Sequence, residues 1–165
     1  MKINYAIADC PLGLLLVGAT EKGICSVTLG DDAEKLRHDL AAEFPQAEIT
    51  RAEAELQSQV QTLVAHLQGQ LPHPDLSLDV RGTAFQQRVW KALRTIPPGR
   101  TATYSDIAQR IGAPNATRAV AKACASNLLA VAIPCHRVVR RDGTLSGYRW
   151  GVERKRALLA SEAHE

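Results

Sequence analysis

The stretch TYSDIAQRIGAPNATRAVAKACAS, residues 103–126, decides the fold of the second half of the chain. Thr103 and Asp106 stand at the T-x-x-D spacing that starts a helix, and Gly112 supplies a stop one residue past the apolar pattern. Asn115 can then cap a second helix, ATRAVAKACAS. Two short helices joined by a tight turn that contains glycine predict a helix-turn-helix.

The second of these helices is mostly alanine, with Arg118 and Lys122 one turn apart near its start. Small side chains let a helix backbone approach another surface closely, and the two cations can reach phosphates or enter a groove. Alanine-rich helices also pack inside proteins, but two cations on one face argue against complete burial. The pattern therefore favours a surface that meets a polyanion.

Outward from this stretch, residues 85–93 carry an apolar helical stripe that ends at Pro97-Pro98-Gly99. The first half reads differently. Residues 3–10, 12–20 and 23–30 are apolar, β-branched and separated by short turns, which predicts a β-meander. Two helices follow, with apolar positions at 36–44 and 56–67, and then a short alternating strand at 76–80.

These patterns predict two domains of different class. Residues 1–82 form a small α/β layer, a β-meander with helices, whose role is structural. Residues 83–165 form a mainly α domain, winged-helix-like, that carries the helix-turn-helix. Arg81-Gly82 marks the boundary.

Charge divides the chain at the same place. Residues 1–82 carry 6 Lys and Arg against 12 Asp and Glu, a net charge of −6, whereas residues 83–165 carry 14 against 5, a net charge of +9. The second half is therefore suited to a polyanion. No signal peptide and no apolar run of membrane-spanning length is visible, so we expect a cytoplasmic protein with no membrane partner.

Four cysteines, Cys10, Cys25, Cys124 and Cys135, are widely spaced and form no C-x-x-C pair. That spacing argues against both a disulfide framework and a zinc ribbon, and we expect no metal. Cys124, within the alanine-rich helix, is interpreted as a small core residue.

Cys135 differs because it lies in IPCHRVVR, residues 133–140, beside His136. Two arginines lie within this stretch, and a third, Arg141, follows it directly. Nucleophilic cysteine chemistry needs thiolate, which a nearby histidine or cations favour. Neighbours on an extended segment point to opposite faces, so a bridging water or a bend is needed to join the thiol to His136. The carboxylates that could orient His136 are Asp142, Glu153, Glu162 and Glu165, and spacing alone does not choose among them. The alternative is a buried structural thiol in a strand ending at Val139.

IPCHRVV, preceded by an Arg-Ala-Val helix and followed by GTLSGYRWG, resembles the O6-alkylguanine-DNA alkyltransferases over almost the whole chain. The likeness is closest to the C-terminal, alkyl-accepting domain of the bacterial Ada type. It implies single-turnover DNA repair without a cofactor, in which Cys135 takes the alkyl group of O6-methylguanine or O4-methylthymine as a thioether. His136 would be the base, acting through a water and oriented by Glu162. Asn127 would tie the recognition helix to the PCHR segment, and the Tyr104 hydroxyl would donate to guanine N3.

The resemblance also implies how DNA is held. Arg118 would replace the flipped nucleotide in the stack, while Tyr104, Ala119 and Lys122 contact the duplex from its minor groove. The substrate pocket would be formed by Val138, Tyr148, Arg149 and Trp150. Trp150 stands where some relatives have glycine, and we expect it to disfavour bulky adducts.

The expected partner is therefore double-stranded DNA with an O6-alkylguanine or O4-alkylthymine, bound by a monomer. Two alternatives remain at this point: an alkyltransferase-like protein that binds lesions without transfer, and a winged-helix regulator. A cysteine hydrolase would also need an oxyanion hole, for which the sequence gives no sign.

Overall fold

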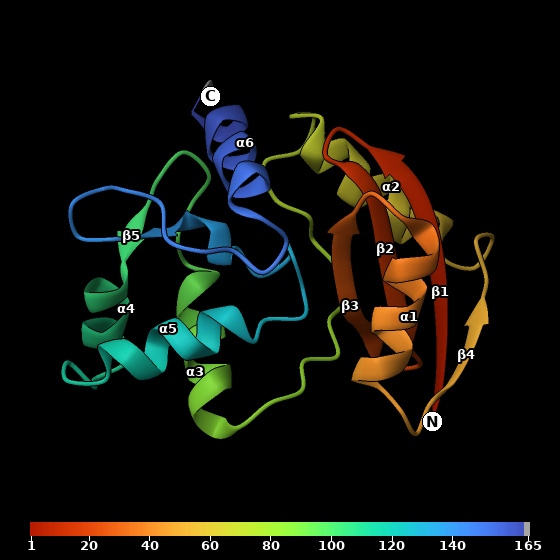
Figure 1. Cartoon of the computed structure of the whole chain (residues 1–165), viewed down its shortest axis with the longest axis horizontal. Coiled ribbons are helices and arrows are strands. Elements are labelled where there is room, and N and C mark those ends of the chain that lie inside the picture. The colour runs from red at the N-terminus through yellow and green to blue at the C-terminus, as the bar shows by residue number, and fades with distance from the viewer. Residues whose placement is uncertain (164–165) are drawn as a thin grey trace. The chain divides into compact units, whose positions relative to one another are not determined.

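The computed structural model describes residues 1–163 and contains two compact units. One comprises Met1–Val80 together with Leu128–Ala132, and the other comprises Arg81–Asn127 together with Ile133–Glu165. Figure 1 shows a sheet with helices in the first and a mainly helical second unit. The predicted fold class, an α/β layer followed by a helix-turn-helix region, is confirmed.

The first unit is built on a four-stranded sheet in the order β3-β2-β1-β4. The first three strands form the predicted antiparallel meander, whose bounds are Lys2–Cys10 (β1), Gly13–Thr20 (β2) and Gly23–Gly30 (β3). The fourth strand, Glu48–Arg51 (β4), pairs in parallel with β1. It was not predicted, because four residues that are mostly exposed carry no apolar pattern.

Two helices pack on this sheet, Ala33–Glu43 (α1) and Gln57–Leu67 (α2), and both were predicted from apolar spacing. Figure 1 shows α1 across one face and α2 behind the other. Leu36 and Leu40 of α1 join Ile3 and Tyr5 of β1 in a buried cluster. Burying a leucine side chain contributes about 2 kcal/mol, so this cluster fixes α1 to the sheet.

The outer edge of β3 is covered by two short segments instead of another strand. Ile24 exchanges backbone hydrogen bonds with Ser77 and Asp79, and Val27 does so with Leu128 and Ala130. The strand predicted at 76–80 was therefore wrong: it is a single bridge, because prolines at 72 and 74 remove donors just before it.

The second unit contains five helical segments and a two-stranded parallel pair within the described residues. The bounds are Ala84–Leu93 (α3), Ala102–Thr103 (β5), Tyr104–Arg110 (α4), Thr117–Ala125 (α5), Cys135–Arg137 (η1, a 3₁₀ turn), Val138–Val139 (β6) and Val152–Glu162 (α6). α4 and α5 are the predicted helix-turn-helix. Thr103 and Asp106 form a complete capping box at the start of α4, and Gly112 adopts the left-handed φ of +76° after it.

One helix start was predicted wrongly. Asn115 does not cap α5; the N-cap residue is Ala116, which offers no side-chain acceptor. Tertiary contacts hold α5 farther along its length. The Trp90 indole Nε1 of α3 donates to the Ala123 carbonyl at 2.9 Å, and Val120 of α5 is fully buried.

Candidate active site

Cys135 is the first residue of η1 and is 5% exposed. The turn begins after Pro134, where the Cys135 amide donates to the Ile133 carbonyl at 2.8 Å. β6 follows at once and pairs with β5, which leads directly into Tyr104 of α4. Of the two possibilities left open, a bridging water or a bend, a bend is present as a 3₁₀ turn, and the alternative of a strand through Cys135 is wrong.

Cys135 lines a cavity of about 590 Å³. Helix α5 supplies Ala121, Cys124 and Ala125 to its lining, and the loop after β6 supplies Ser146, Tyr148 and Arg149. Tyr104 and Arg140 complete its polar lining. The lining thus combines small side chains from one helix with phenols and cations from other segments.

Asn127 ties this cavity to the helix-turn-helix. Its side-chain amide is 1% exposed and donates both to the Ile133 carbonyl at 3.0 Å and to Cys135 Sγ at 3.3 Å. Because one amide holds the backbone before the turn and the sulfur itself, it fixes the direction in which the thiol points.

The resting thiol is protonated. Burial raises the pKa of Cys135 from 9.0 to about 11, although the Asn127 hydrogen bond and the charges of Lys155 and Arg149 act in the opposite direction. Burial therefore outweighs the nearby cations, and the pKa of the thiol lies above its ordinary value in this state. Arg137, the nearest arginine in sequence, turns away from the sulfur toward a carboxylate.

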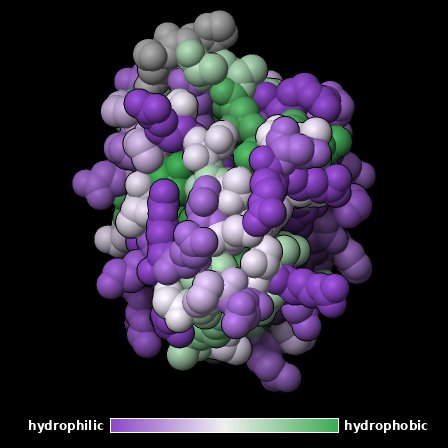
Figure 2. All heavy atoms as spheres, turned by 90° about the vertical axis from the view of Figure 1, so that its left-hand side faces the viewer, coloured by the Kyte–Doolittle hydropathy of each residue, from purple (hydrophilic) through white to green (hydrophobic). Residues whose placement is uncertain are grey.

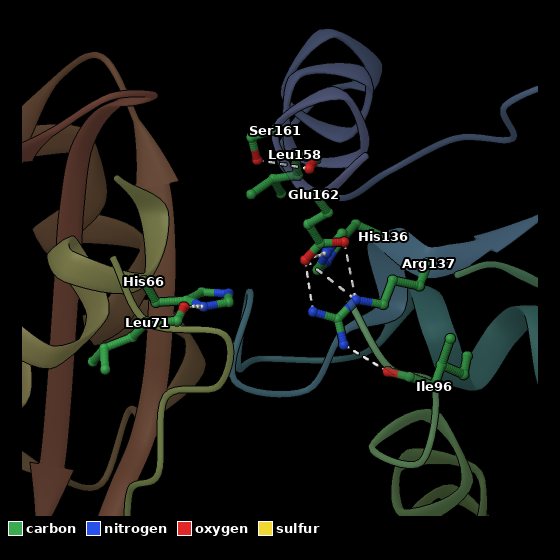
Figure 3. A network of polar contacts seen from close by, with 8 residues as sticks. All are labelled: His66, Leu71, Ile96, His136, Arg137, Leu158, Ser161 and Glu162. Atoms are coloured by element: carbon green, nitrogen blue, oxygen red, sulfur yellow. Dashed lines mark hydrogen bonds and ion pairs between the residues drawn. The ribbon is translucent and has the colours of Figure 1, made fainter. Parts of the chain in front are cut away.

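That carboxylate belongs to Glu162 of α6, one of the four candidates left open by the sequence. His136 is fully buried, and its Nε2 lies 3.1 Å from Glu162 Oε2. Figure 3 shows His136 and Arg137 both pointing toward the Glu162 carboxylate from η1. Asp142 and Glu153 are exposed, and Glu165 lies outside the described residues.

The Glu162 carboxyl is ionised. Burial alone would raise its pKa, but hydrogen bonds and charges from His136 and Arg137 outweigh burial and lower the pKa from 4.5 to about 2. An ionised carboxylate only accepts hydrogen bonds, so His136 Nε2 carries the proton and donates it. The remaining ring nitrogen, Nδ1, is then the one that can act as a base.

A second polar chain runs along the other side of the cavity. Lys155 of α6 is 1% exposed, and its Nζ donates to Ser146 Oγ at 3.0 Å. Ser146 Oγ in turn shares a short hydrogen bond with the Tyr104 hydroxyl. Burial lowers the pKa of Lys155 and raises that of Tyr104. The chain therefore links a buried ammonium to a phenol that lines the cavity.

The DNA-contact residues predicted on α5 are at the surface. Arg118, Ala119 and Lys122 are exposed, while Val120 and Ala123 of the same helix are buried. Figure 2 looks onto the side of the molecule that carries α4 and β5, and hydrophilic residues cover most of it. α5 thus presents cations outward and small side chains to the cavity.

Two predicted pocket residues do not line the cavity. Val138 is fully buried at the start of β6. Trp150 is 7% exposed and packs edge-on against Tyr148, with ring centroids 5.2 Å apart. Trp150 contacts two residues that do line the cavity, Tyr148 and Arg149, so an effect of Trp150 on the cavity passes through them.

Comparison with known proteins accounts for both halves of the chain. Residues 3–80 match the 6-O-methylguanine DNA methyltransferase, ribonuclease-like domain, and residues 84–164 match the DNA binding domain of the same enzyme. The methylated-DNA–protein-cysteine methyltransferase of Mycolicibacterium paratuberculosis is 39% identical over 160 residues, 97% of this chain and 92% of the relative. The chain belongs to the 6-O-methylguanine DNA methyltransferase family.

A second relative and a solved structure are also similar to this chain. The bifunctional transcriptional activator/DNA repair enzyme Ada of Escherichia coli is 54% identical over 163 residues, 99% of this chain but 46% of Ada. The chain thus spans about half the length of that relative. The crystal structure of Mycobacterium tuberculosis OGT in complex with DNA has a TM-score of 0.85 at 38% identity, and covers 98% of this chain and 93% of that one.

Sequence reasoning missed Lys155, Ser146 and the direction of Arg137. Lys155 sits in the charged run ERKR, which is typical of an exposed helix face, so nothing local indicated its burial. Among residues 1–163, no cluster of three or more His, Cys, Asp or Glu side chains could hold a metal ion. Across the same residues, every helix is too short or too polar to cross a bilayer.

Proposed function

We propose that this chain repairs DNA by taking the alkyl group of O6-methylguanine, and of O4-methylthymine, onto Cys135 in a single irreversible turnover. The observation that carries the proposal is that Cys135, whose Sγ accepts a hydrogen bond from Asn127, lines a cavity shared with the second helix of a helix-turn-helix. A sulfur that reacts with DNA must lie where a nucleotide can enter, and the position of Cys135 at this cavity supports that role.

Transfer needs a base, because the resting thiol has a pKa of about 11 and only ~1 in 10⁴ molecules is thiolate at pH 7. His136, oriented by ionised Glu162, takes the proton through a water at Nδ1. The sulfur then attacks the alkyl carbon. The S–C bond forms as the C–O6 bond breaks, and the electron pair of that bond passes to the purine.

The departing guanine gains a proton as it leaves. The Tyr104 hydroxyl donates to guanine N3, and Ser146 and Lys155 behind it stabilise the negative charge that develops on the phenol oxygen. Guanine therefore departs as a neutral base. The thioether left on the sulfur has no partner that can remove it, so each chain reacts once.

DNA reaches the site through α5. O6 of a paired guanine is buried in the duplex, so the nucleotide must be flipped, at a cost of a few kcal/mol. Arg118 fills the gap left in the stack, and Lys122 and the exposed Ala119 meet the backbone of the minor groove. A single chain supplies every residue that this reaction uses, so we propose a monomer.

Mass spectrometry after incubation with a duplex that contains one O6-methylguanine tests the proposal. We expect a gain of about 14 Da on the Cys135 peptide, saturating at about one methyl per chain. The matched control is Cys135→Ser, which should bind the duplex and gain nothing. Binding by the wild type with an unchanged mass would instead favour a lesion-binding protein without transfer.

A further inference from the structure

The Arg137 guanidinium donates hydrogen bonds to Glu162 and to the Ile96 carbonyl, yet the reaction steps above make no use of it. Its side chain is 3% exposed. Nη2 donates to Glu162 Oε2 at 2.6 Å, and Nε donates to both carboxylate oxygens at 3.0 and 3.2 Å. On its other side, Nη1 donates to the Ile96 carbonyl at 2.6 Å, as Figure 3 shows.

This geometry makes Glu162 a shared carboxylate. Oε2 accepts from Arg137 and from His136 at once, so the two donors compete for one negative charge. A carboxylate held by histidine alone would place its full charge on the imidazole and favour the imidazolium. Because the Arg137 guanidinium is paired to it, the Glu162 carboxylate still orients the His136 ring. It favours protonation of the second ring nitrogen less than an unpaired carboxylate would.

Other charged and titratable groups near His136, Arg137 and Glu162 do not take over the neutralisation of the Glu162 carboxylate. Besides burial, the charge of Glu162 raises the pKa of Tyr148, in the loop after β6, and the charge of Arg154 lowers it. Lys155 and Arg149 act on the Cys135 sulfur. Within the described residues, Arg137 is the cation that contacts the carboxylate partner of His136 directly.

We propose that Arg137 is a positioning residue for the base of the reaction: by neutralising Glu162 and tying it to the Ile96 carbonyl, it keeps His136 as the neutral Nε2–H tautomer, with Nδ1 ready to accept the Cys135 proton. This rests on the proposed function for its use in catalysis, but its effect on His136 can be measured without DNA. Replacing the guanidinium with an apolar side chain leaves Glu162 to act on the imidazole alone, which then protonates at higher pH.

The test is a ¹⁵N-resolved NMR titration of His136 in the full chain, with the signal assigned from a His136→Gln variant. In the wild type at neutral pH we expect the Nε2–H tautomer, and an Nδ1–H tautomer would overturn the proposal. Arg137→Met should raise the titration midpoint of His136 by about one pH unit. The matched variant Arg137→Lys keeps the charge and should leave the midpoint in place, whereas a midpoint unmoved in Arg137→Met would refute the idea.

A double variant covers the case in which Arg137→Met does not fold. Arg137→Met with Glu162→Gln leaves neither member of the ion pair without its partner, and His136 should then titrate at or below the wild-type midpoint because no carboxylate remains to attract a second proton. A midpoint above that of the wild type would overturn the proposal. The pH profile of methyl transfer, run in parallel, should shift with the NMR midpoint. If the wild type takes up no methyl group, the proposed function fails, while the NMR titration still decides the role of Arg137.

Discussion

Without DNA, Cys135 should react slowly with iodoacetamide at neutral pH, and its rate should climb about tenfold per pH unit between pH 7 and 10. The magnitude follows from burial, which raises the pKa of the thiol from 9.0 to about 11. Alkylation requires thiolate, so the rate at pH 7 should be ~100-fold below that of an unperturbed thiol. Asn127→Ala should slow it further, because the amide donates to the sulfur at 3.3 Å and favours the anion.

Peptide-resolved mass spectrometry over a time course gives the rate at each cysteine of the same chain. The partly exposed Cys10 of β1 is the internal reference for reagent and pH. Cys124, whose pKa burial raises to about 12, should be slower than Cys135. Cys135→Ser confirms the assignment of the label. A rate at Cys135 that levels off by pH 8, or that exceeds the rate at Cys10 at pH 7, would show that the resting sulfur is a thiolate and refute the reasoning.

Four further predictions concern the residues around this thiol. Glu162→Gln should lower the free energy of unfolding by about 3 kcal/mol in a urea titration, because Arg137 loses its charged partner; an unchanged midpoint would contradict this. Burial would raise the pKa of Glu162, but hydrogen bonds from His136 and Arg137 lower it to about 2. The contribution of the ionised carboxylate to the free energy of unfolding should therefore be complete above pH 4.5 and lost as the pH falls toward 2. Tyr104→Phe should slow methyl transfer about 100-fold while duplex affinity is kept, and equal rates would exclude the phenol as proton donor. Trp150→Gly should increase the rate with O6-benzylguanine relative to O6-methylguanine by freeing Tyr148, and an unaltered ratio would discard that idea.

Local signals predicted much of the fold. The meander was readable because strands with buried residues carry apolar and β-branched runs between turns. α4 was readable because Thr103 and Asp106 satisfy each other's backbone donors, a relation that spans only three residues. β4 and the edge segment at 77–79 have no such local pattern. Each is held by a partner strand distant in sequence, and a single sequence does not reveal that pairing.

In the candidate site too, contacts between residues close in sequence were predicted better than contacts between distant residues. Cys135 and Asn127 lie close together in sequence, and the 3₁₀ turn that begins at Cys135 accompanies the contact between the sulfur and the Asn127 amide. The effect of nearby charges on the Cys135 thiol was predicted less well. Three arginines near the thiol suggested a lowered pKa, but proximity in sequence does not say where a guanidinium points, and Arg137 pairs with a helix 25 residues away. Lys155, which does act on the sulfur, lies 20 residues from it in sequence.

The bonds from Val27 of β3 to Leu128 and Ala130 limit how the molecule can be dissected. A recombinant fragment that started at residue 83 would retain Leu129 and Ala130, which are 3% and 0% exposed, but would lack the strand that shields them. Their amides and carbonyls would face water, and an apolar five-residue stretch would become a site for aggregation or proteolytic nicking. Catalytic fragments of this chain should therefore be produced by co-expression with the complementary piece, so that the edge of β3 is rebuilt during refolding.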